Sequence, residues 1–390
     1  MENKNVPSIR FKGFFDDWEQ RKLIDNAEKV LDYRGKSPTK FGMEWGNEGY
    51  LVLSALNVKN GYIDKSIEAK YGSPELFERW MGDNRLVKGD VLFTTEAPLG
   101  NVAQVPDNKG YILNQRAVAF KASKVTDNNF FAQLLRSPII QNILNSNSSG
   151  GTAKGIGMKE FAKISAHVPK LEEQQKIGLF FKQLDETITL QERELELLKL
   201  TKKGFLQQLF PENNQLFPNI RFSNFQNEWE QRKLGEVLRS HPLRTYLAEP
   251  IYGGEYEVIQ QGDNPIIGTA NGKPFAEYYS VILFGDHTVS LFKPQKPFFV
   301  ATDGVKIISA DNFDGNYLFT TLERYKPESQ GYKRHFTILK NIDFCFTENK
   351  NEQIKIGTFF KQIEETISLQ ERKLKNLKIV KSAFLQKMFI

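Results

Sequence analysis

The chain has 390 residues, of which 40% are hydrophobic and 26% are charged, an ordinary balance for a folded globular protein. At roughly 150 residues per domain, this length predicts two or three domains. The single cysteine, Cys345, excludes an internal disulfide scaffold. The polar N-terminus predicts no signal peptide, and the lack of long apolar runs predicts no membrane span, so we expect a cytoplasmic protein. The net charge of +6 fits a phosphate-binding surface without requiring one.

The chain begins with a short motif that recurs in its second half. Ile9–Phe11 and Trp18–Leu23 reappear as Ile220–Phe222 and Trp229–Leu234, at one constant offset and without a gap. Internal repeats of this kind predict a duplicated architecture.

The first insert, residues 24–172, has the pattern of a mixed α+β domain. Short helices are expected from Ser73 and over Asn128–Leu135. Glycine and asparagine turns separate the expected strands, which are Tyr50–Leu53, Asp90–Thr94 and Ala117–Phe120.

A long repeat follows this insert. Glu173–Phe210 matches Glu352–Phe389 at a second constant offset, with roughly 24 of 38 positions identical. Spacings that alternate between four and three predict a heptad seam on each copy, and both seams continue through a lysine, Lys202 or Lys381. The seam residues are Ile177, Phe181, Leu184, Ile188, Gln191, Leu195 and Leu198 in the first copy, and Ile356, Phe360, Ile363, Ile367, Gln370, Leu374 and Leu377 in the second.

The identical seams favour pairing of the two helices with each other. The alternative is two separate amphipathic helices, each packed on its own domain. If a two-fold axis relates the halves, the paired helices run antiparallel.

The turn-rich segment Pro211–Pro218 separates the halves. The second insert, residues 235–351, shows no evident sequence counterpart to the first. Its approach to the helix, Phe344–Glu348, lacks the proline that precedes the first helix, which leaves open whether the second domain closes in the same way. Its expected strands are Glu255–Gln260, Ser280–Phe284, Phe298–Val300 and Val305–Ile308.

The sequence contains no catalytic constellation that we recognise. Its four histidines are isolated, without metal-ligand spacing. Gly35–Ser37 resembles the end of a phosphate loop, but Val30 stands where the first glycine would be. Asp286 with His287 is better explained by a structural or ligand-contacting histidine than by an acid–base pair.

Polar and basic loop residues remain as candidates for nucleic-acid contact, against the alternative of solvated turns. Arg and Lys suit guanine edges and phosphates, and Asn and Gln suit adenine. Lys154 and Lys333 lie in glycine-containing loops before the final strand of each insert, so we expect them to contact phosphates. The candidates in the first insert are Arg34, Lys36, Ser37, Asn57, Thr94, Thr95, Asn114, Gln115, Arg116, Thr152 and Lys154, and those in the second are Gln260, Gln261, Asn271, Lys273, His287, Thr288, Thr302, Lys306, Lys333 and Arg334.

The long repeat resembles a known family. Its Glu-Gln-x-Lys-Ile-Gly, Phe-Phe and Leu-Gln-x-Arg elements look like the helix of the specificity subunit of type I restriction-modification enzymes. The segments Lys88–Thr94, Gly155–Pro169, Val258–Asp263 and Phe284–Thr288 are also similar to that family. The resemblance covers essentially the whole chain.

The resemblance implies an α+β fold with two target-recognition domains of mixed α/β structure. Two long helices forming an antiparallel coiled coil would separate them, with pseudo-two-fold symmetry. It implies a DNA-binding subunit that is not itself an enzyme. Each domain would read one half of a bipartite target in double-stranded DNA, and the coiled coil would set the spacer.

The resemblance also implies partners: two modification (methyltransferase) subunits, docked on exposed coiled-coil faces, and restriction (endonuclease and translocase) subunits. S-adenosylmethionine, ATP and Mg²⁺ would serve those partners, and no cofactor is expected in this chain. The chain has no Pro-Pro, and hence no Asn-Pro-Pro-Tyr motif of an adenine methyltransferase.

The expected domains are a first target-recognition domain (1–171), a first helix (172–210), a linker (211–218), a second target-recognition domain (219–350) and a second helix (351–390). Two other interpretations stay open. One is the recognition subunit of a fused restriction–methylation enzyme. The other is a coiled-coil adaptor whose inserts bind protein, which predicts weak, sequence-blind binding to DNA.

Overall fold

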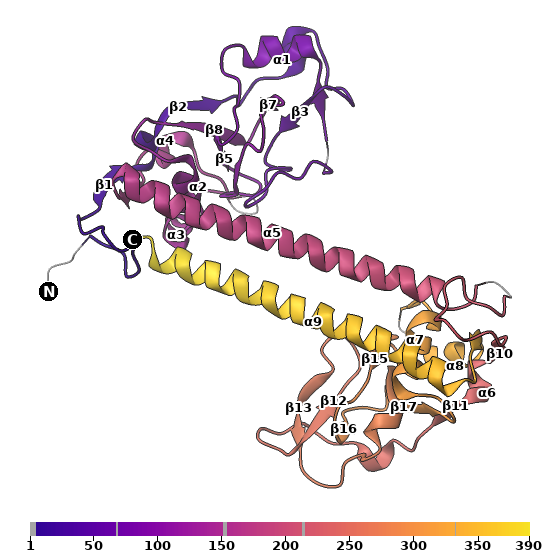
Figure 1. The fold of residues 1–390 in the computed structure, drawn as a ribbon. Coiled ribbons are helices and arrows are strands. Elements are labelled where there is room, and N and C mark those ends of the chain that lie inside the picture. The colour runs from indigo at the N-terminus through magenta and orange to yellow at the C-terminus, as the bar shows by residue number, and fades with distance from the viewer. Residues whose placement is uncertain (1–4, 68, 151–153, 213–214, 332) are drawn as a thin grey trace. The chain divides into compact units, whose positions relative to one another are not determined.

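The computed structural model describes residues 5–67, 69–150, 154–212, 215–331 and 333–390 (Figure 1). The chain divides into two compact units, the first made of Met1–Glu192 with Lys373–Ile390 and the second of Arg193–Arg372. Two long helices, α5 (Leu171–Gln208) and α9 (Lys350–Lys387), therefore contribute one part to each unit. Within the described residues, no helix has the length and apolar character needed to cross a membrane.

The first unit contains a four-stranded sheet in the order β2-β8-β5-β6, a three-stranded sheet β4-β3-β7 and a ribbon β1-β9. Its strands are β1 (Glu19–Lys22), β2 (Ala27–Asp32), β3 (Tyr50–Leu53), β4 (Tyr71–Gly72), β5 (Val91–Thr94), β6 (Val102–Gln104), β7 (Tyr111–Leu113), β8 (Ala117–Ala122) and β9 (Ser165–Val168). Its helices are η1 (Leu23–Asn26), η2 (Pro38–Phe41), α1 (Pro74–Met81), α2 (Asn128–Arg136), α3 (Pro138–Ser146) and α4 (Met158–Phe161).

The second unit contains the sheets β11-β17-β14-β15 and β13-β12-β16 and a ribbon β10-β18. Its strands are β10 (Glu230–Lys233), β11 (Leu238–Ser240), β12 (Tyr256–Ile259), β13 (Ile266–Ala270), β14 (Ile282–Gly285), β15 (Leu291–Phe292), β16 (Phe298–Val300), β17 (Val305–Ala310) and β18 (Asp343–Phe346). Its helices are α6 (Leu234–Val237), η3 (Arg244–Tyr246), η4 (Tyr278–Ser280), α7 (Gly315–Tyr325) and α8 (His335–Lys340).

The two inserts share one topology although their sequences show no evident match. In each unit the four-stranded sheet is antiparallel, and the three-stranded sheet joins one antiparallel pair to one parallel pair, β3–β7 or β12–β16. The strands expected from the sequence all form. The predicted fold class, mixed α+β domains with two long helices, is confirmed.

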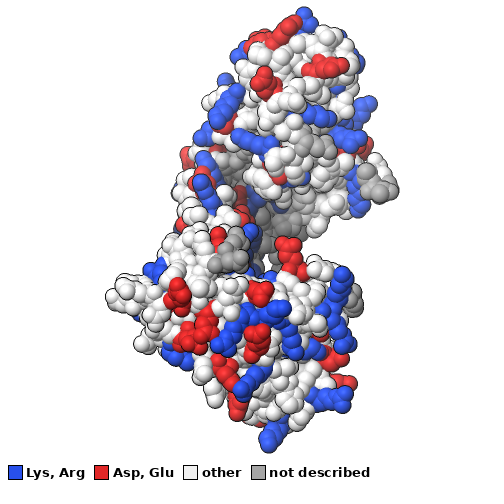
Figure 2. Space-filling model, turned by 90° about the vertical axis from the view of Figure 1, so that its right-hand side faces the viewer, with Lys and Arg blue, Asp and Glu red and all other residues white. Residues whose placement is uncertain are grey.

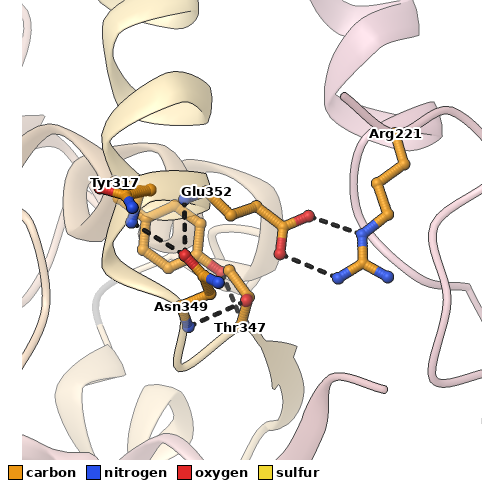
Figure 3. Close-up of polar contacts among 6 residues, drawn as sticks. Arg221, Tyr317, Thr347, Asn349 and Glu352 are labelled. Carbon is orange, nitrogen blue, oxygen red and sulfur yellow. Dashed lines mark hydrogen bonds and ion pairs between the residues drawn. The ribbon is translucent and has the colours of Figure 1, made fainter. Parts of the chain in front are cut away.

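The second domain closes onto its helix in the same way as the first. β10 pairs with β18 as β1 pairs with β9. Where the first domain has Pro169, the backbone N–H of Thr347 donates to the hydroxyl of Tyr317 at 3.1 Å (Figure 3). The side chain of Asn349 then caps the first turn of α9 by accepting from the N–H of Asn351 at 3.0 Å.

The core of each unit includes the end of one long helix. In the first unit, Phe389 at the end of α9 lies 6.4 Å from Trp18, ring centre to ring centre. In the second, Phe210 just past α5 lies 5.6 Å from Trp229. All four rings are almost fully buried. The short repeat thus packs against the end of the other copy's helix.

The parts of α5 and α9 that share a unit pair antiparallel. In the first unit, Phe180 contacts Phe384 and Glu192 pairs with Lys378. In the second, Glu194 accepts from Gln370 and Phe205 contacts Phe359. In both units the partner number falls as the number along α5 rises.

All predicted seam residues are buried or half-buried. Buried members are Ile177, Phe181, Ile188, Gln191, Ile356, Phe360, Ile367 and Leu374, and half-buried members are Leu184, Leu195, Leu198, Ile363, Gln370 and Leu377. Apolar burial along this stripe is what stabilises long helices in proteins.

The glutamate of the repeated helix motif holds the short repeat. Arg10 donates two hydrogen bonds to Glu173, at 2.7 and 2.8 Å. Arg221 does the same with Glu352, at 2.7 and 2.9 Å (Figure 3). Both carboxylates are buried, so this bidentate geometry is what makes their burial tolerable.

The glutamine and glycine of the same motif fix the mixed α/β domain of each unit on the helix. The amide oxygen of Gln174 accepts from the N–H of Asp127, which caps α2, and Gln353 accepts from Asp314, which caps α7. At Gly178, a Cβ would lie 2.3 Å from the Asp127 carboxylate, so only glycine lets the helix approach this closely. The motif therefore positions each domain by direct contact.

Candidate nucleic-acid interface

Turns from distant parts of the first insert meet at one edge of the first domain. The N–H of Thr95 donates to the carbonyl of Arg116 at 2.9 Å, and the N–H of Ile156 donates to the carbonyl of Thr95 at 2.9 Å. The side-chain amide of Gln115 donates to the carbonyl of Lys36 at 3.1 Å. We name this place, residues 33–37, 94–97, 114–116 and 154–156, the first-domain edge.

A small hollow opens beside the first-domain edge. Its volume is about 170 Å³, and polar groups of Ser54, Lys70, Asn114, Gln115 and Arg116 line part of it. A concave, polar site with several donors and acceptors is suited to hydrogen bonding with a ligand.

The second domain gathers its candidate residues in the same manner. The N–H of Asp286 donates to the carbonyl of Gly304 at 2.7 Å, and the N–H of His335 donates to the carbonyl of Asp286 at 2.7 Å. The side chain of Gln261 accepts from the N–H of His287 at 3.0 Å. We name residues 260–262, 286–288, 302–306 and 330–335, of which Tyr332 lies outside the described part, the second-domain edge.

The two edges are built on equivalent backbone hydrogen bonds. Thr95 corresponds to Asp286, because each follows the matching strand, β5 or β14, and makes the same two bonds. Arg116 then corresponds to Gly304, and Ile156 to His335. Lys154 and Lys333 each stand two residues before this last pair, so they also correspond to each other. One scaffold thus presents different side chains in the two domains.

The edges also hold the strained backbone positions of the chain. Among the described residues, Ala97, Arg116 and Val289 have φ values of 46°, 64° and 59°, a region that side chains with a Cβ rarely adopt. All three lie in or beside an edge; the other two such residues are asparagines, which tolerate it. Strain of this sort is concentrated at functional sites.

Most candidate side chains at the edges reach solvent. Arg34, Gln115, Arg116, Lys154, Thr288, Thr302, Lys333 and Arg334 are exposed, and Ser37, Asn114, Gln260, Gln261, His287 and Lys306 are half-buried. Of these, Lys306 donates to the carbonyl of Asp303 at 2.7 Å and lies 3.7 Å from Asp286.

Three predicted contact residues point inward and support the turns instead. Asn57 is buried, with its amide bonded to the N–H of Ser54 and the carbonyl of Val52. Thr94 is buried and its hydroxyl donates to Pro98 at 2.6 Å. The ammonium of Lys36 lies over the Tyr33 ring, and burial lowers its pKa. The polar groups of Asn57 and Thr94 are already used inside the domain, and Lys36 is half-buried, so contact of these three residues with DNA stays a prediction.

The remaining candidates lie away from the edges, are buried, or fall outside the described residues. Asn271 and Lys273 follow β13, whose last residue Ala270 pairs with Tyr256 at the start of β12. Gln260 follows the other end of β12, so the length of the hairpin separates them. Thr95 is buried at the first-domain edge. Thr152 lies outside the described residues.

Carboxylates that were not predicted organise the arginines of the first-domain edge. Asp32 accepts from Arg34, and although burial opposes its ionisation, these hydrogen bonds lower its pKa. Glu96 lies 2.9 Å from Arg116 and also near Arg34. The sequence signal that could have identified Glu96 is its position directly after Thr94–Thr95, in an insert whose other candidate loops carry Arg34, Lys36 and Arg116.

On the face shown in Figure 2, the distribution of charged side chains does not single out one site. Figure 2 shows Lys and Arg side chains interspersed with Asp and Glu over the face that it presents. Within the described part of the chain, no group of three or more His, Cys, Asp or Glu side chains could hold a metal ion. The edges are identified by their convergent turns.

The paired helices carry two further features. The seam lysines bind carboxylates: Lys202 pairs with Glu323 of α7 and Glu364 of α9, and Lys381 pairs with Asp185. The helices also carry exposed apolar residues on the side opposite the seam. Each stands two positions after a seam residue in the sequence, which is a rotation of about 200° around the helix. They include Leu179, Leu190, Leu197, Leu200, Leu369 and Ile379.

Comparison with known proteins agrees with this architecture. Residues 15–200 and 226–378 each match the type I restriction modification DNA specificity domain. The chain is 22% identical over 364 residues to the type I restriction enzyme MjaVIII specificity subunit of Methanocaldococcus jannaschii, covering 92% of this chain and 70% of that protein. It is 23% identical over 275 residues to the putative MjaX specificity subunit of the same organism, covering 65% and 63%.

Solved structures show the same fold. The S subunit of the type I restriction-modification system from M. genitalium matches with a TM-score of 0.68 at 14% identity, covering 99% of both chains. A structure from work on complex assembly and conformational transition of the type I R-M system matches with a TM-score of 0.50 at 18% identity, covering 94% of this chain and 96% of that one. The family match covers most of the chain and agrees with its duplicated architecture. The chain therefore belongs to the specificity-subunit family of type I restriction-modification enzymes.

Proposed function

We propose that this chain is the non-catalytic, sequence-specific DNA-binding subunit of a type I restriction-modification complex. Each target-recognition domain reads one half of a bipartite target in double-stranded DNA through its edge. The paired helices set the spacer between the half-sites. The observation that carries the proposal is the repeated edge, in which one hydrogen-bonded scaffold presents different polar side chains in the two domains.

This arrangement supports sequence reading for a physical reason. Bases are distinguished by side chains that match their donor and acceptor patterns, whereas phosphates are held by any suitably placed cation. Lys154 and Lys333 occupy equivalent positions in the two domains, as a shared phosphate contact requires. Arg116 and Gly304 also occupy equivalent positions but differ, as two different half-sites require.

The same proposal assigns the outer helix faces to partner subunits. Exposed leucines such as Leu190 and Leu369 stand opposite the seam, where they contribute nothing to pairing of the helices. We propose that modification subunits cover them, that S-adenosylmethionine, ATP and Mg²⁺ serve these and the restriction subunits, and that the complex works in the cytoplasm.

The test is co-purification with a type I modification (methyltransferase) subunit from the same organism, followed by mapping of N6-methyladenine in host DNA. We expect a complex and one bipartite methylation motif that disappears when this chain is deleted. A complex without any change in methylation would contradict the reading role. Sequence-blind binding without a methyltransferase complex would favour the adaptor interpretation.

A further inference from the structure

We propose that Arg116, held in place by Glu96, reads a guanine in the first half-site. This inference rests on the proposed function and deepens it, because it assigns one base to one side chain. The first step is geometric. Glu96 Oε1 lies 2.9 Å from the Nε of Arg116, and the two side chains are 46% and 57% exposed. The nearest atoms of the pair are Glu96 Oε1 and Arg116 Nε, and the exposed Arg116 side chain leaves its guanidinium accessible to a ligand.

The backbone on both sides of this pair is fixed. The carbonyl of Arg116 accepts from Thr95, the residue before Glu96, and Glu96 bridges to Gly155. Gly155 leaves room for this close approach, since a Cβ there would lie 3.1 Å from the Cβ of Glu96. Arg116 holds a φ of 64° in this framework. A strained and doubly tethered arginine is oriented before any ligand arrives.

The chemistry of an oriented guanidinium fits guanine. Two parallel N–H groups match the O6 and N7 acceptors of guanine in the major groove, and each such bidentate contact discriminates strongly against other bases. Asn114 and Gln115 lie next to Arg116 around the same hollow and can address the neighbouring base edges. A phosphate contact needs no such orientation.

The other arginine of the first-domain edge is less suited to this role. Arg34 directs three N–H···O contacts to Asp32, at 3.0, 2.9 and 2.5 Å, so its fork is already filled by a carboxylate. In the second domain, Gly304 and His287 stand where Arg116 and Glu96 stand in the first. The second half-site is therefore read by other groups.

The experiment uses the full chain assembled with its modification subunits. Binding is measured to duplexes in which each base pair of both half-sites is changed in turn. We expect the wild-type complex to prefer guanine at one position of the first half-site by about 10- to 100-fold. Arg116→Ala reduces this preference to about 1- to 3-fold and leaves every other position unchanged. Discrimination in the second half-site shows in the same molecule that the variant is folded.

Glu96→Ala tests the positioning role. We expect it to weaken the preference at the same position as Arg116→Ala and at no other, and the double variant to add nothing to Arg116→Ala. A uniform loss of affinity for all duplexes, with a flatter salt dependence, would show that Arg116 binds a phosphate and would overturn the inference. An unchanged base preference would overturn it as well. If the wild-type complex itself had no base preference, the proposed function would fail instead.

Discussion

Basic side chains at the two edges differ in what already holds them. Lys36 lies against the rings of Tyr33 and Trp80, Arg34 donates three hydrogen bonds to Asp32, and Arg116 approaches Glu96 most closely through its Nε. Lys154 and Lys333 are exposed at equivalent positions. In the proposed function, the partner that each side chain already has, and not the residue type alone, decides how freely it can contact DNA.

Lys154 and Lys333 provide a matched pair for the phosphate role. We expect Lys154→Ala and Lys333→Ala each to weaken binding of target and non-target duplexes by the same factor. Each also makes the slope of log affinity against log salt shallower by about one unit, because one phosphate contact is lost. Fluorescence anisotropy over a range of salt concentrations measures both effects. A loss confined to the target duplex would contradict the role of that lysine.

At the scale of the element, the repeated helix combines three tasks in one sequence. Its seam pairs the helices, its Glu-Gln…Gly motif holds the domain, and its outer face carries exposed leucines. The seam and the Glu-Gln…Gly motif constrain two sides of the helix, and the proposed partner contact would constrain a third, which accounts for the two copies being so much more alike than the inserts. An insert must keep its backbone hydrogen bonds and an apolar core, which many different sequences can do.

The ion pair between Lys381 and Asp185 in the first unit makes the free energy of unfolding depend on pH. Burial raises the pKa of this carboxyl, but Arg136 and Lys381 outweigh burial and lower it. Its contribution to stability is therefore complete above the unfolded pKa of about 3.9 and is lost as the pH falls through the lower folded pKa.

We accordingly expect Asp185→Asn to lower the free energy of unfolding by about 1–3 kcal/mol at pH 7. The difference from the wild type shrinks as the pH falls below about 3.9, because Asp185 is protonated first in the unfolded state and then, at its lower pKa, in the folded state. Urea unfolding at pH 7 and pH 3 measures this, with the exposed neighbour Glu186→Gln as a control. A difference that is equal at both pH values would assign the effect to packing.

The outer leucines yield a second test at this scale. Leu190→Gln and its repeat counterpart Leu369→Gln leave the free energy of unfolding within about 0.5 kcal/mol, since both side chains are exposed. Each weakens binding of the modification subunit by about 10-fold or more, because an apolar contact is lost. Pull-down titration measures it, with Glu196→Gln as the matched polar control. Unchanged binding in both leucine variants would exclude this face.

At the scale of the whole molecule, the proposed function makes the length of the paired helices set the spacer of the target. Removing one heptad from each helix shortens the pair by about 10 Å. At ~3.4 Å per base pair, we expect the spacer to shorten by about three base pairs while both half-sites stay the same. Methylation mapping reads both quantities at once. Altered half-sites with an unchanged spacer would disprove the role of the helices in setting the spacer.

The sequence predicted the parts of this molecule that repetition and periodicity encode. The seam from Ile177 to Leu198 and strands such as Tyr50–Leu53 follow from spacing alone. The common topology of the inserts did not, because it rests on backbone bonds such as Thr95 to Arg116 and Asp286 to Gly304, which leave no mark on side-chain type. Asn57 turned out to face inward for a similar reason: its partners are backbone groups of its own turn.

The placement of Phe389 beside Trp18 has a consequence for biosynthesis. The ribosome makes the sheets of the first unit early, yet the core around Trp18 is closed only when α9 has been completed. The second unit, which spans Arg193–Arg372, has all of its residues before that moment. The domain that is translated first is therefore the one whose core is finished last. Until then, the apolar surface meant for Phe384 and Phe389 stays open to chaperones.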